Sequence, residues 1–417
     1  MAINGEGEEQ RLYSLLPSLT ARSFSFVNSA GQNNPTYEFL PSRGQPVGLN
    51  ILTTTLPANL FPLTWLLPSG NLFIQTNWGA EIFDYKNNVE YALPNIPHSV
   101  RTYPASGGTV MLPLTPANNY VATILFCGGS NLEPDQWVED WAIAKYPADA
   151  SCVNIVPDVS TTWNDDDSLP EGRTLGSMIL LPDEKVLLLN GANTGVAGYG
   201  NVSWAIGHSY ADSPIKSPLI YDPNASKGSK WSRVGLQDST VARMYHSGAL
   251  LLPDGWSFLQ KHFARMLTLC SGSIFVSGSN PNPDYVAAGP GVTYPTEYRV
   301  ERFYPWYYEK RRPEPTNLPT TLAYGGNYWQ TSLTTQDLNN DPATYIQKTK
   351  AVVIRTGFST HAINMSQRLV ELGLSYAVKD DGSATLYVSQ MPPNPALFPP
   401  GPASTSSLML TTVLWEV

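Results

Sequence analysis

Apolar and polar positions repeat as one phrase along the chain before residue 312. An apolar run leads to a turn containing Pro, Asp or Gly, and a second apolar run follows the turn. Copies of this phrase begin at Thr64, Gly108, Gly176 and Ser247. Short apolar strands on both sides of such a turn are typical of β-hairpins. The pattern therefore predicts four hairpins of related design.

A further strand with an aromatic residue follows several of these hairpins. Its copies are AEIFDYKNN from Ala80, PLIYDPNAS from Pro218 and EYRVERFYPWY from Glu297. Hairpins that recur roughly every 45–70 residues, near or above the period of propeller blades, indicate four-stranded blades of the kelch type. We therefore expect a kelch-type β-propeller over residues 1–312, with a large β-sandwich as the alternative.

The character of the chain changes after Arg312. A Pro-rich linker, RRPEPTNLP, begins at Arg311. Beyond it we expect strands at Ala351–Arg355, Leu369–Leu372, Gly382–Tyr387 and Leu408–Leu414. This spacing is typical of a β-sandwich of about a hundred residues. The predicted second domain is therefore an immunoglobulin-like, early-set β-sandwich over residues 313–417.

One segment interrupts the last predicted hairpin. Without the 17 residues Trp256–Gly272, the text reads LLPDG followed by SIFVSGSNPN, which is an uninterrupted blade hairpin. We interpret the segment as a retained intron or an error in the gene model, and a true insertion at a blade edge is the alternative. A transcript that contains these codons would contradict the first interpretation. His262 and Cys270 lie inside the segment and are given no role.

Composition agrees with an all-β class. Apolar residues make up 42% of the 417 residues, and only 14% are charged. The chain also contains 32 Gly, 36 Pro, 22 Tyr and 11 Trp. Many turn-forming and aromatic residues with few charges indicate short strands joined by long loops.

Charge and hydropathy exclude some classes of partner. The net charge is −9, which disfavours a nucleic acid because phosphate binding needs a basic surface. No apolar run approaches the ~18 residues of a membrane helix, so we expect no membrane partner. The acidic start MAINGEGEEQ lacks the features of a signal peptide, so the chain as written is expected to have no route to secretion. We expect a monomer.

Three cysteines occur, at positions 127, 152 and 270. Cys127 lies in the apolar run ATILFCGG, so we expect it to be a buried free thiol. An odd number of cysteines leaves at least one of them without a partner.

Histidine is scarce, and two of the five stand in informative phrases. RMYHSGALLLPDG places Tyr245 and His246 side by side at the start of a blade strand, and THAINMSQR places His361 in a loop of the predicted sandwich. Taken singly, each histidine is more often a surface or core residue than a metal ligand. Imidazole nitrogen and phenolate oxygen are together suitable ligands for Cu(II).

These phrases resemble the copper-radical oxidases, of the galactose oxidase type, and most strongly the fungal glyoxal oxidases. The resemblance runs from about Gln32 to the C-terminus, with YHS and LLPDG, ERFYPWY and THAINMSQR in the family's order. It implies that Tyr245, His246 and His361 are copper ligands. It also implies that Tyr245 accepts the proton of the substrate hydroxyl.

The resemblance further implies a reaction. In the family, a second tyrosine is covalently joined to a cysteine and carries a radical that removes a hydrogen atom from the substrate. Copper and the radical together accept two electrons and pass them to O2, which becomes H2O2. A small aldehyde or α-hydroxy carbonyl of the glyoxal or methylglyoxal type becomes a carboxylic acid. An extracellular location is also implied.

The sequence departs from the family at its N-terminal end. In the family, the radical tyrosine lies in an Arg-x-Tyr phrase of an early blade, and Arg11–Leu12–Tyr13 makes Tyr13 the candidate, with a disordered N-terminal tyrosine as the alternative. Tyr103 follows Arg101 in a similar phrase but matches a later blade, so we interpret it as structural. In the family, the cysteine partner lies upstream of the radical tyrosine. No cysteine precedes Cys127 here, so the Tyr-Cys radical is not expected to form. About five blades can be counted where the family has seven, so we expect a truncated member.

Two other functions remain open at this stage. A non-catalytic propeller that binds carbohydrate or protein would explain the missing cysteine. A glycosidase would need two carboxylates across a cleft, and the run Asp165–Asp167 could supply them. Carboxylates clustered in a polar loop are more often solvated or turn-forming.

Overall fold

The computed structural model shows an all-β protein, as predicted. It describes residues 10–14, 23–28, 35–40, 42–132, 142–252, 272–308, 310, 313–319, 321–400 and 408–412. Strands dominate this part, and its α-helices are single turns such as α1 (Asn50–Thr54) and α2 (Pro342–Tyr345). In the described part, no helix is both long and apolar enough to cross a membrane.

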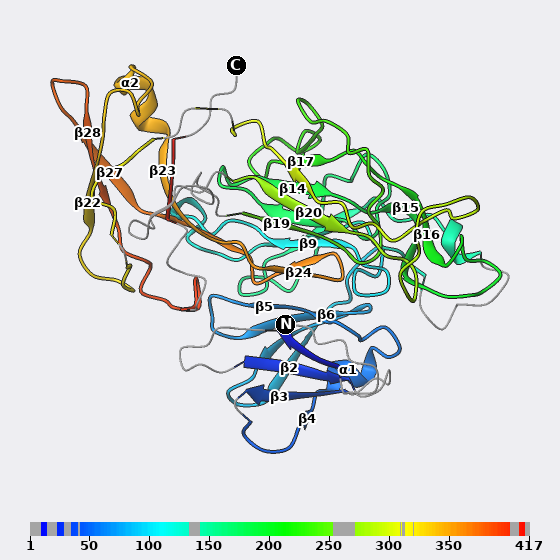
Figure 1. Ribbon diagram of the computed structural model, residues 1–417. Coiled ribbons are helices and arrows are strands. Elements are labelled where there is room, and N and C mark those ends of the chain that lie inside the picture. The colour runs from blue at the N-terminus through cyan, green and yellow to red at the C-terminus, as the bar shows by residue number, and fades with distance from the viewer. Residues whose placement is uncertain are drawn as a thin grey trace.

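Five antiparallel sheets of the described part have the form of propeller blades (Figure 1). In each sheet, neighbouring strands follow one another along the chain, apart from one inserted hairpin in the fourth. This number agrees with the count made from the sequence. The strands are β1 (Gln10–Ser14), β2 (Ser23–Asn28), β3 (Thr36–Leu40) and β4 (Val47–Gly48); β5 (Leu63–Leu66), β6 (Leu72–Thr76), β7 (Gly79–Asp84) and β8 (Val89–Leu93); β9 (Gly108–Met111), β10 (Ile124–Cys127), β11 (Cys152–Ile155) and β12 (Asn164–Asp166); β13 (Ser177–Leu180), β14 (Val186–Leu189), β17 (Leu219–Tyr221) and β18 (Trp231–Ser232); and β19 (Ser247–Leu251), β20 (Ile274–Gly278) and β21 (Glu301–Phe303).

All four predicted hairpins are present as β5–β6, β9–β10, β13–β14 and β19–β20. Every residue of β9, β10, β13 and β14 is buried, which explains why these strands read as continuous apolar runs rather than alternating ones. Strands β19 and β20 pair up to Leu251 and Ile274, on either side of the interrupting segment. Residues 253–271, which include all of that segment except Gly272, lie outside the described residues.

One hairpin was not predicted. Strands β15 (Ala192–Tyr199) and β16 (Ser209–Pro214) lie between β14 and β17 and pair with each other. In Figure 1 they extend from the edge of the fourth blade. Glycine-rich text with mixed polarity hides this hairpin from a search for apolar strands.

The C-terminal part is a sandwich with an inserted hairpin. Its predicted strands are present as β23 (Thr349–Arg355), β26 (Arg368–Leu372), β28 (Ala384–Val388) and β29 (Leu408–Thr412). Strands β23, β26 and β29 form one sheet, and β22 (Trp329–Leu333), β27 (Leu374–Val378) and β28 form the other. Between β23 and β26 the chain forms the hairpin of β24 (Phe358–Thr360) and β25 (Ile363–Met365).

The hairpin β24–β25 reaches from the sandwich into the propeller. It contacts β9, β13 and β19, the first strands of three blades, and Figure 1 shows it beneath them. Gln367 holds its base, because its side-chain oxygen accepts from the backbone N–H of Leu180 at 2.9 Å and its side-chain nitrogen donates to Met178 O at 2.8 Å. Lys350 adds an ion pair across the interface to Glu184 at 2.7 Å. The two domains are therefore joined through the hairpin.

The expectation of a free thiol at Cys127 is wrong. Cys127 and Cys152 form a disulfide across β10 and β11, where the two residues stand directly opposite each other. Both side chains are buried in the core of the blade. Strand register brings them together, and register is not visible in the spacing of the cysteines.

This disulfide should stabilise the propeller measurably. It closes a loop with a sequence separation of 25 residues, so we expect the Cys127→Ala/Cys152→Ala variant to lose about 2–4 kcal/mol of unfolding free energy. Chemical denaturation of both proteins, with and without a reductant, measures the difference. The reductant should destabilise the wild type and leave the variant unchanged; equal stability of the two oxidised proteins would contradict the prediction.

Candidate active site

The tip of the hairpin β24–β25 presents His361. Thr360 pairs with Ile363, so His361 and Ala362 are the two central residues of the turn. Their φ angles are 52° and 66°, and a two-residue hairpin turn with both φ values positive has the type I′ form. The turn thus places an imidazole at the point of the hairpin farthest from the sandwich.

Tyr245 and His246 immediately precede β19. The backbone N–H of Asn280, just after β20, donates to Tyr245 O at 2.8 Å, and His246 Nδ1 lies 2.9 Å from Asn280 O. His246 also has a positive φ, 62°. Positive φ at non-glycine residues is held by the surrounding structure and concentrates at functional sites. Two such histidines in one place are therefore notable.

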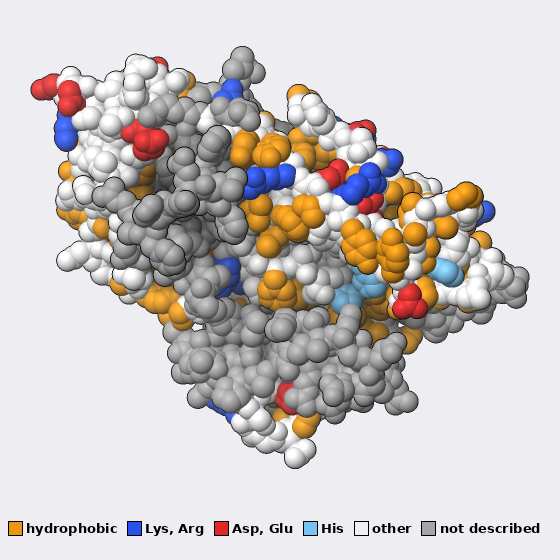
Figure 2. Space-filling view, viewed as in Figure 1, with side chains coloured by type: hydrophobic (Ala, Val, Ile, Leu, Met, Phe, Trp, Pro, Cys, Tyr) orange, Lys and Arg blue, Asp and Glu red, His pale blue; other side chains and the backbone are white. Residues whose placement is uncertain are grey.

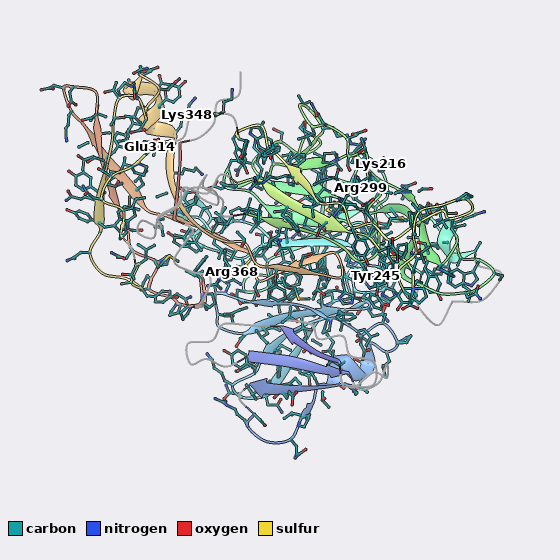
Figure 3. The ribbon with its side chains drawn as sticks, in the orientation of Figure 1. Lys216, Tyr245, Arg299, Glu314, Lys348 and Arg368 are labelled. Atoms are coloured by element: carbon teal, nitrogen blue, oxygen red, sulfur yellow. A yellow bond between two sulfur atoms is a disulfide. The ribbon has the colours of Figure 1, made fainter. Side chains whose placement is uncertain are left out.

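The structure brings Tyr245, His246 and His361 together, although 115 residues separate the second from the third. The rings of Tyr245 and His246 stack with centroids 3.9 Å apart, and the ring of Tyr245 lies 6.5 Å from that of His361. Figure 3 shows Tyr245 at one end of the hairpin β24–β25 and Arg368 at the other. In Figure 2, histidine surface adjoins hydrophobic side chains on the viewed face.

Burial keeps the ionisable groups of this cluster neutral. Burial lowers the pKa of His361 to about 4, with a further contribution from His246. The pKa of His246 is also lowered by partial desolvation, although one edge of its side chain remains exposed. Burial, followed by the neighbouring Tyr103, raises the pKa of Tyr245. At neutral pH the site therefore holds two neutral imidazoles and a protonated phenol.

Tyr103 and Phe61 complete the cluster. The sequence interpretation gave no role to Phe61 and only a structural role to Tyr103. The rings of Tyr103 and Tyr245 lie 6.3 Å apart, and the ring of Tyr103 lies 5.6 Å from that of His361. The ring of Phe61 lies against His361 with centroids 3.6 Å apart. Tyr103 shares the Arg-x-Tyr phrase with Tyr245, so the shared phrase was the available signal. The interpretation of Tyr103 as merely structural therefore does not account for its place in this cluster.

Comparison with known proteins gives a consistent family. The model of the glyoxal oxidase N-terminus matches residues 6–307, and the model of the galactose oxidase-like early-set domain matches residues 312–408. The first match alone covers more than half of the chain. This chain belongs to the glyoxal oxidase family.

Relatives of this glyoxal oxidase family member are found in plants. The chain is 31% identical to the aldehyde oxidase GLOX of Vitis pseudoreticulata, over 95% of this chain and 69% of the relative. It is 29% identical to the aldehyde oxidase GLOX1 of Arabidopsis thaliana, over 94% of this chain and 60% of the relative. A solved fungal alcohol oxidase of the AA5 family, in complex with copper, superposes with a TM-score of 0.54 at 14% identity, over 97% of this chain and 85% of that chain. This last likeness concerns the fold.

The other predicted element of a glyoxal oxidase site is only partly described. Tyr13 lies in β1, paired with Ser25, but its side chain lies outside the described residues. The cysteines of the described part are Cys127 and Cys152, and both are joined in the disulfide. Cys270 lies outside the described residues. The described part of this family member therefore contains no cysteine that could be joined to a tyrosine.

The acidic run Asp165–Asp167 lies away from the histidine cluster, in and just after the outer strand β12 rather than in the polar loop assumed from the sequence. Each carboxylate is engaged locally. Asp166 pairs with Lys230 at 2.8 Å, Asp167 accepts from the backbone N–H groups of Gly228 and Lys230, and Asp165 contacts His98 at 2.7 Å. These contacts join neighbouring strands and loops and account for the run.

Proposed function

We propose that this chain is a copper-dependent oxidase that converts small aldehydes or α-hydroxy carbonyls to carboxylic acids. A hydrated aldehyde would lose two electrons and two protons, and O2 would gain them to form H2O2. The observation that carries the proposal is the convergence of Tyr245, His246 and His361 at the tip of the hairpin. Family membership supports the reaction class, and the plant relatives bear the name aldehyde oxidase.

The donor set suits copper. His246 Nδ1 donates to Asn280 O, which leaves Nε2 with a free lone pair. His361 Nδ1 lies 2.8 Å from Thr360 Oγ1, which orients that ring in the same manner. A metal-binding imidazole commonly has its other nitrogen fixed by a hydrogen bond of this kind. With the phenol of Tyr245, these atoms form a nitrogen and oxygen set appropriate to Cu(II).

Copper, when bound, would supply a Lewis acid and a one-electron acceptor that the side chains cannot provide, and O2 would be the final acceptor of both electrons. Tyr245 would accept the proton of the substrate hydroxyl at its Oη. Its phenol is protonated without a metal, because burial and Tyr103 raise its pKa. A neighbouring cation lowers the pKa of a coordinated group, so the phenolate is accessible only at the occupied site. Tyr103 would stabilise that oxygen by donating a hydrogen bond to it.

The aromatic surroundings favour a small substrate. Phe61 covers one face of His361, while Tyr199 lies 6.2 Å from Tyr245 and 6.1 Å from His246. These rings leave the exposed edge of His246 as the approach from solvent. A two- or three-carbon aldehyde such as methylglyoxal suits such an approach better than a sugar. The disulfide supports an extracellular location, since disulfides persist in oxidising compartments.

The Tyr-Cys radical does not fit the described residues, so no step is assigned to it. Both cysteines of the described part are consumed in the disulfide. This observation favours a second candidate function, a catalytically inactive propeller that retains the metal ligands and binds carbohydrate or protein. The two candidates differ in peroxide release and agree in copper binding.

The deciding experiment measures copper content and peroxide release from methylglyoxal by the copper-loaded chain. The wild type should bind one copper and release peroxide, and His246→Ala should lose both properties because one of two imidazole ligands is gone. His98→Ala is the matched control, since His98 is exposed and pairs with Asp165 outside the cluster. Copper bound without peroxide would overturn the oxidase in favour of the inactive propeller. Copper retained by His246→Ala would overturn the ligand assignment.

A further inference from the structure

Two buried arginines lie at the base of the hairpin β24–β25. Arg355 ends β23 and Arg368 begins β26, and the two residues stand directly opposite each other across the strands. Only 6% of Arg355 and 7% of Arg368 is exposed. Like charges directly opposite in a sheet are destabilising, and burial makes their repulsion stronger. Burial, then the charge of Arg355, lowers the pKa of Arg368 to about 9.

The hydrogen-bond partners of these arginines are neutral backbone oxygens, and the guanidinium of Arg355 also lies over the ring of Phe398, 4.5 Å from its centroid. Arg368 donates through Nη1 to Ala396 O at 2.8 Å and to Leu397 O at 3.1 Å, and through Nη2 to Leu66 O at 2.8 Å. Arg355 donates through Nη2 to Pro399 O. The Nε of Arg355 is buried, and no hydrogen-bond partner for it is found among the described residues.

Other deeply buried arginines of the described part differ in one respect, because each has a carboxylate nearby. Arg101 lies 3.7 Å from Asp149, Arg173 lies 3.3 Å from Glu171, and Arg243 lies 2.7 Å from Glu301. Within the described ranges, no carboxylate forms an ion pair with Arg355 or Arg368. The described residues thus supply this pair of buried charges with no carboxylate, and a buried charge without a negative partner is strongly destabilising, so an anion beside the pair would be favoured.

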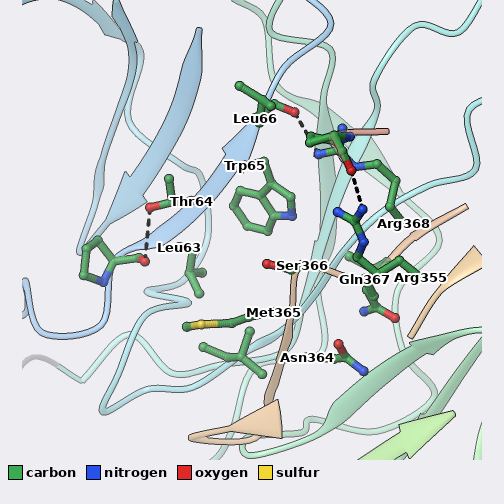
Figure 4. Close-up of a pocket in the computed structure, with 14 residues that line it drawn as sticks. Leu63, Thr64, Trp65, Leu66, Arg355, Asn364, Met365, Ser366, Gln367 and Arg368 are labelled. Atoms are coloured by element: carbon green, nitrogen blue, oxygen red, sulfur yellow. Dashed lines mark hydrogen bonds between the residues drawn. The ribbon is translucent and has the colours of Figure 1, made fainter. Parts of the chain in front are cut away.

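A cavity lies beside the pair, between the sandwich and the propeller (Figure 4). Trp65 and neighbouring residues of β5 form one wall, and the segment from Ile363 to Arg368 forms another. Its free space is about 40 Å³, and a water-sized group needs ~10–15 Å³ on this measure. It therefore admits about three or four such groups. Asn364 Oδ1 on its wall is also buried, and the described residues offer it no donor.

We propose that this cavity binds a single small monovalent anion, a halide or a compact planar carboxylate, next to Arg355 and between the wall that contains Trp65 and the wall that contains Asn364. The guanidinium supplies the charge and the free Nε–H, and a water molecule beside the anion donates to Asn364 Oδ1. The space is too small for a tetrahedral oxyanion such as phosphate or sulfate. Arginine is the side chain best suited to this role, since its planar donors stay charged when buried.

The site has a structural consequence for the hairpin. An anion there would offset the repulsion between Arg355 and Arg368 at the point where β23 leaves the sandwich and β26 returns to it. Arg368 already joins this point to the propeller through Leu66 O. The anion would therefore fix the base of the element whose tip carries His361. This inference does not depend on the proposed oxidase activity.

Thermal unfolding of the full chain tests the proposal with bromide as the probe. Sodium bromide is compared with sodium gluconate at equal ionic strength and pH, because gluconate is too large for the cavity. Bromide should raise the Tm of the wild type by about 2 °C relative to gluconate. The difference should vanish in Arg355→Met and persist in the control Arg302→Met, since Arg302 is exposed on β21.

Anomalous diffraction from bromide-soaked crystals of the wild type locates the anion without any variant. A bromide peak within hydrogen-bond distance of Arg355, together with the salt-specific rise in Tm, would support the site even if Arg355→Met failed to fold. No peak in the cavity would overturn the proposal. A peak without any salt-specific stabilisation would mean an adventitious ion only, and would overturn it as well.

Discussion

Replacement of Tyr245 by Phe is expected to lower peroxide release from methylglyoxal by ~10²–10⁴-fold, the usual effect of removing a positioned proton acceptor. The substitution deletes the oxygen that would take the substrate proton and keeps the ring that stacks on His246 at 3.9 Å. Copper content should stay near that of the wild type, because both imidazoles remain. The measurement is the initial rate of peroxide release divided by the bound copper.

Tyr103→Phe is the matched control for this prediction. It removes the neighbouring hydroxyl that would donate a hydrogen bond to the Tyr245 oxygen, on a ring 6.3 Å from that of Tyr245, and leaves Tyr245 in place. One hydrogen bond has a net contribution of about 0.5–1.5 kcal/mol, so the rate should fall by only ~2–10-fold. An unchanged rate in Tyr245→Phe would remove Tyr245 from the reaction. Equal losses in both variants would point to the hydrogen bond rather than the proton acceptor.

Much of the architecture was predictable because blade hairpins are local. The strands beginning near Gly108 and Gly176 are buried on both faces, so their apolar runs and turn residues determine them without long-range information. Two residues of the candidate site were predictable for a similar reason, since Tyr245 and His246 are adjacent in the sequence. Their meeting with His361 followed from the family resemblance, because no local pattern links residues so far apart.

What could not be predicted depends on register and on the order of blades around the ring. Cys127 pairs with Cys152 only because β10 and β11 align these two positions. Tyr103 and Tyr245 each belong to an Arg-x-Tyr phrase that precedes the first strand of a blade. The two tyrosines meet because their blades place these equivalent phrases close together, a relation that spacing in the sequence does not encode. The sequence also conceals that these phrases begin with a structural arginine.

That arginine recurs as a buried anchor of three blades, at Arg101, Arg173 and Arg243. Each side chain is at most 1% exposed and donates to a backbone oxygen at the end of the second strand or just after it: Gly128 O, Asn190 O and Gly278 O. Arg101 also donates to Ser151 O at 3.1 Å and to Ser151 Oγ at 2.8 Å. A single side chain thus joins the start of a blade to its second and third strands.

Arg101→Met should therefore destabilise the propeller by about 3–5 kcal/mol, the cost of removing one partner from a buried charged network. Methionine fills most of the space but removes the hydrogen bonds that Arg101 donates to Gly128 O, Ser151 O and Ser151 Oγ, and Asp149 loses its cation at 3.7 Å. Burial lowers the pKa of Arg101 to about 10, so the guanidinium is charged at neutral pH and these losses apply in full. Chemical denaturation measures the loss as a lower transition midpoint.

Arg233→Met separates this effect from a general effect of losing an arginine. Arg233 pairs with Glu171 at the exposed edge of a blade, and an exposed ion pair contributes at most ~1 kcal/mol. The two variants carry the same change in charge and nearly the same change in volume, so they differ mainly in burial and in the buried hydrogen bonds that are lost. If Arg101→Met proved no less stable than Arg233→Met, the blade sheet would owe its stability to apolar packing, and the recurring arginine would need another explanation.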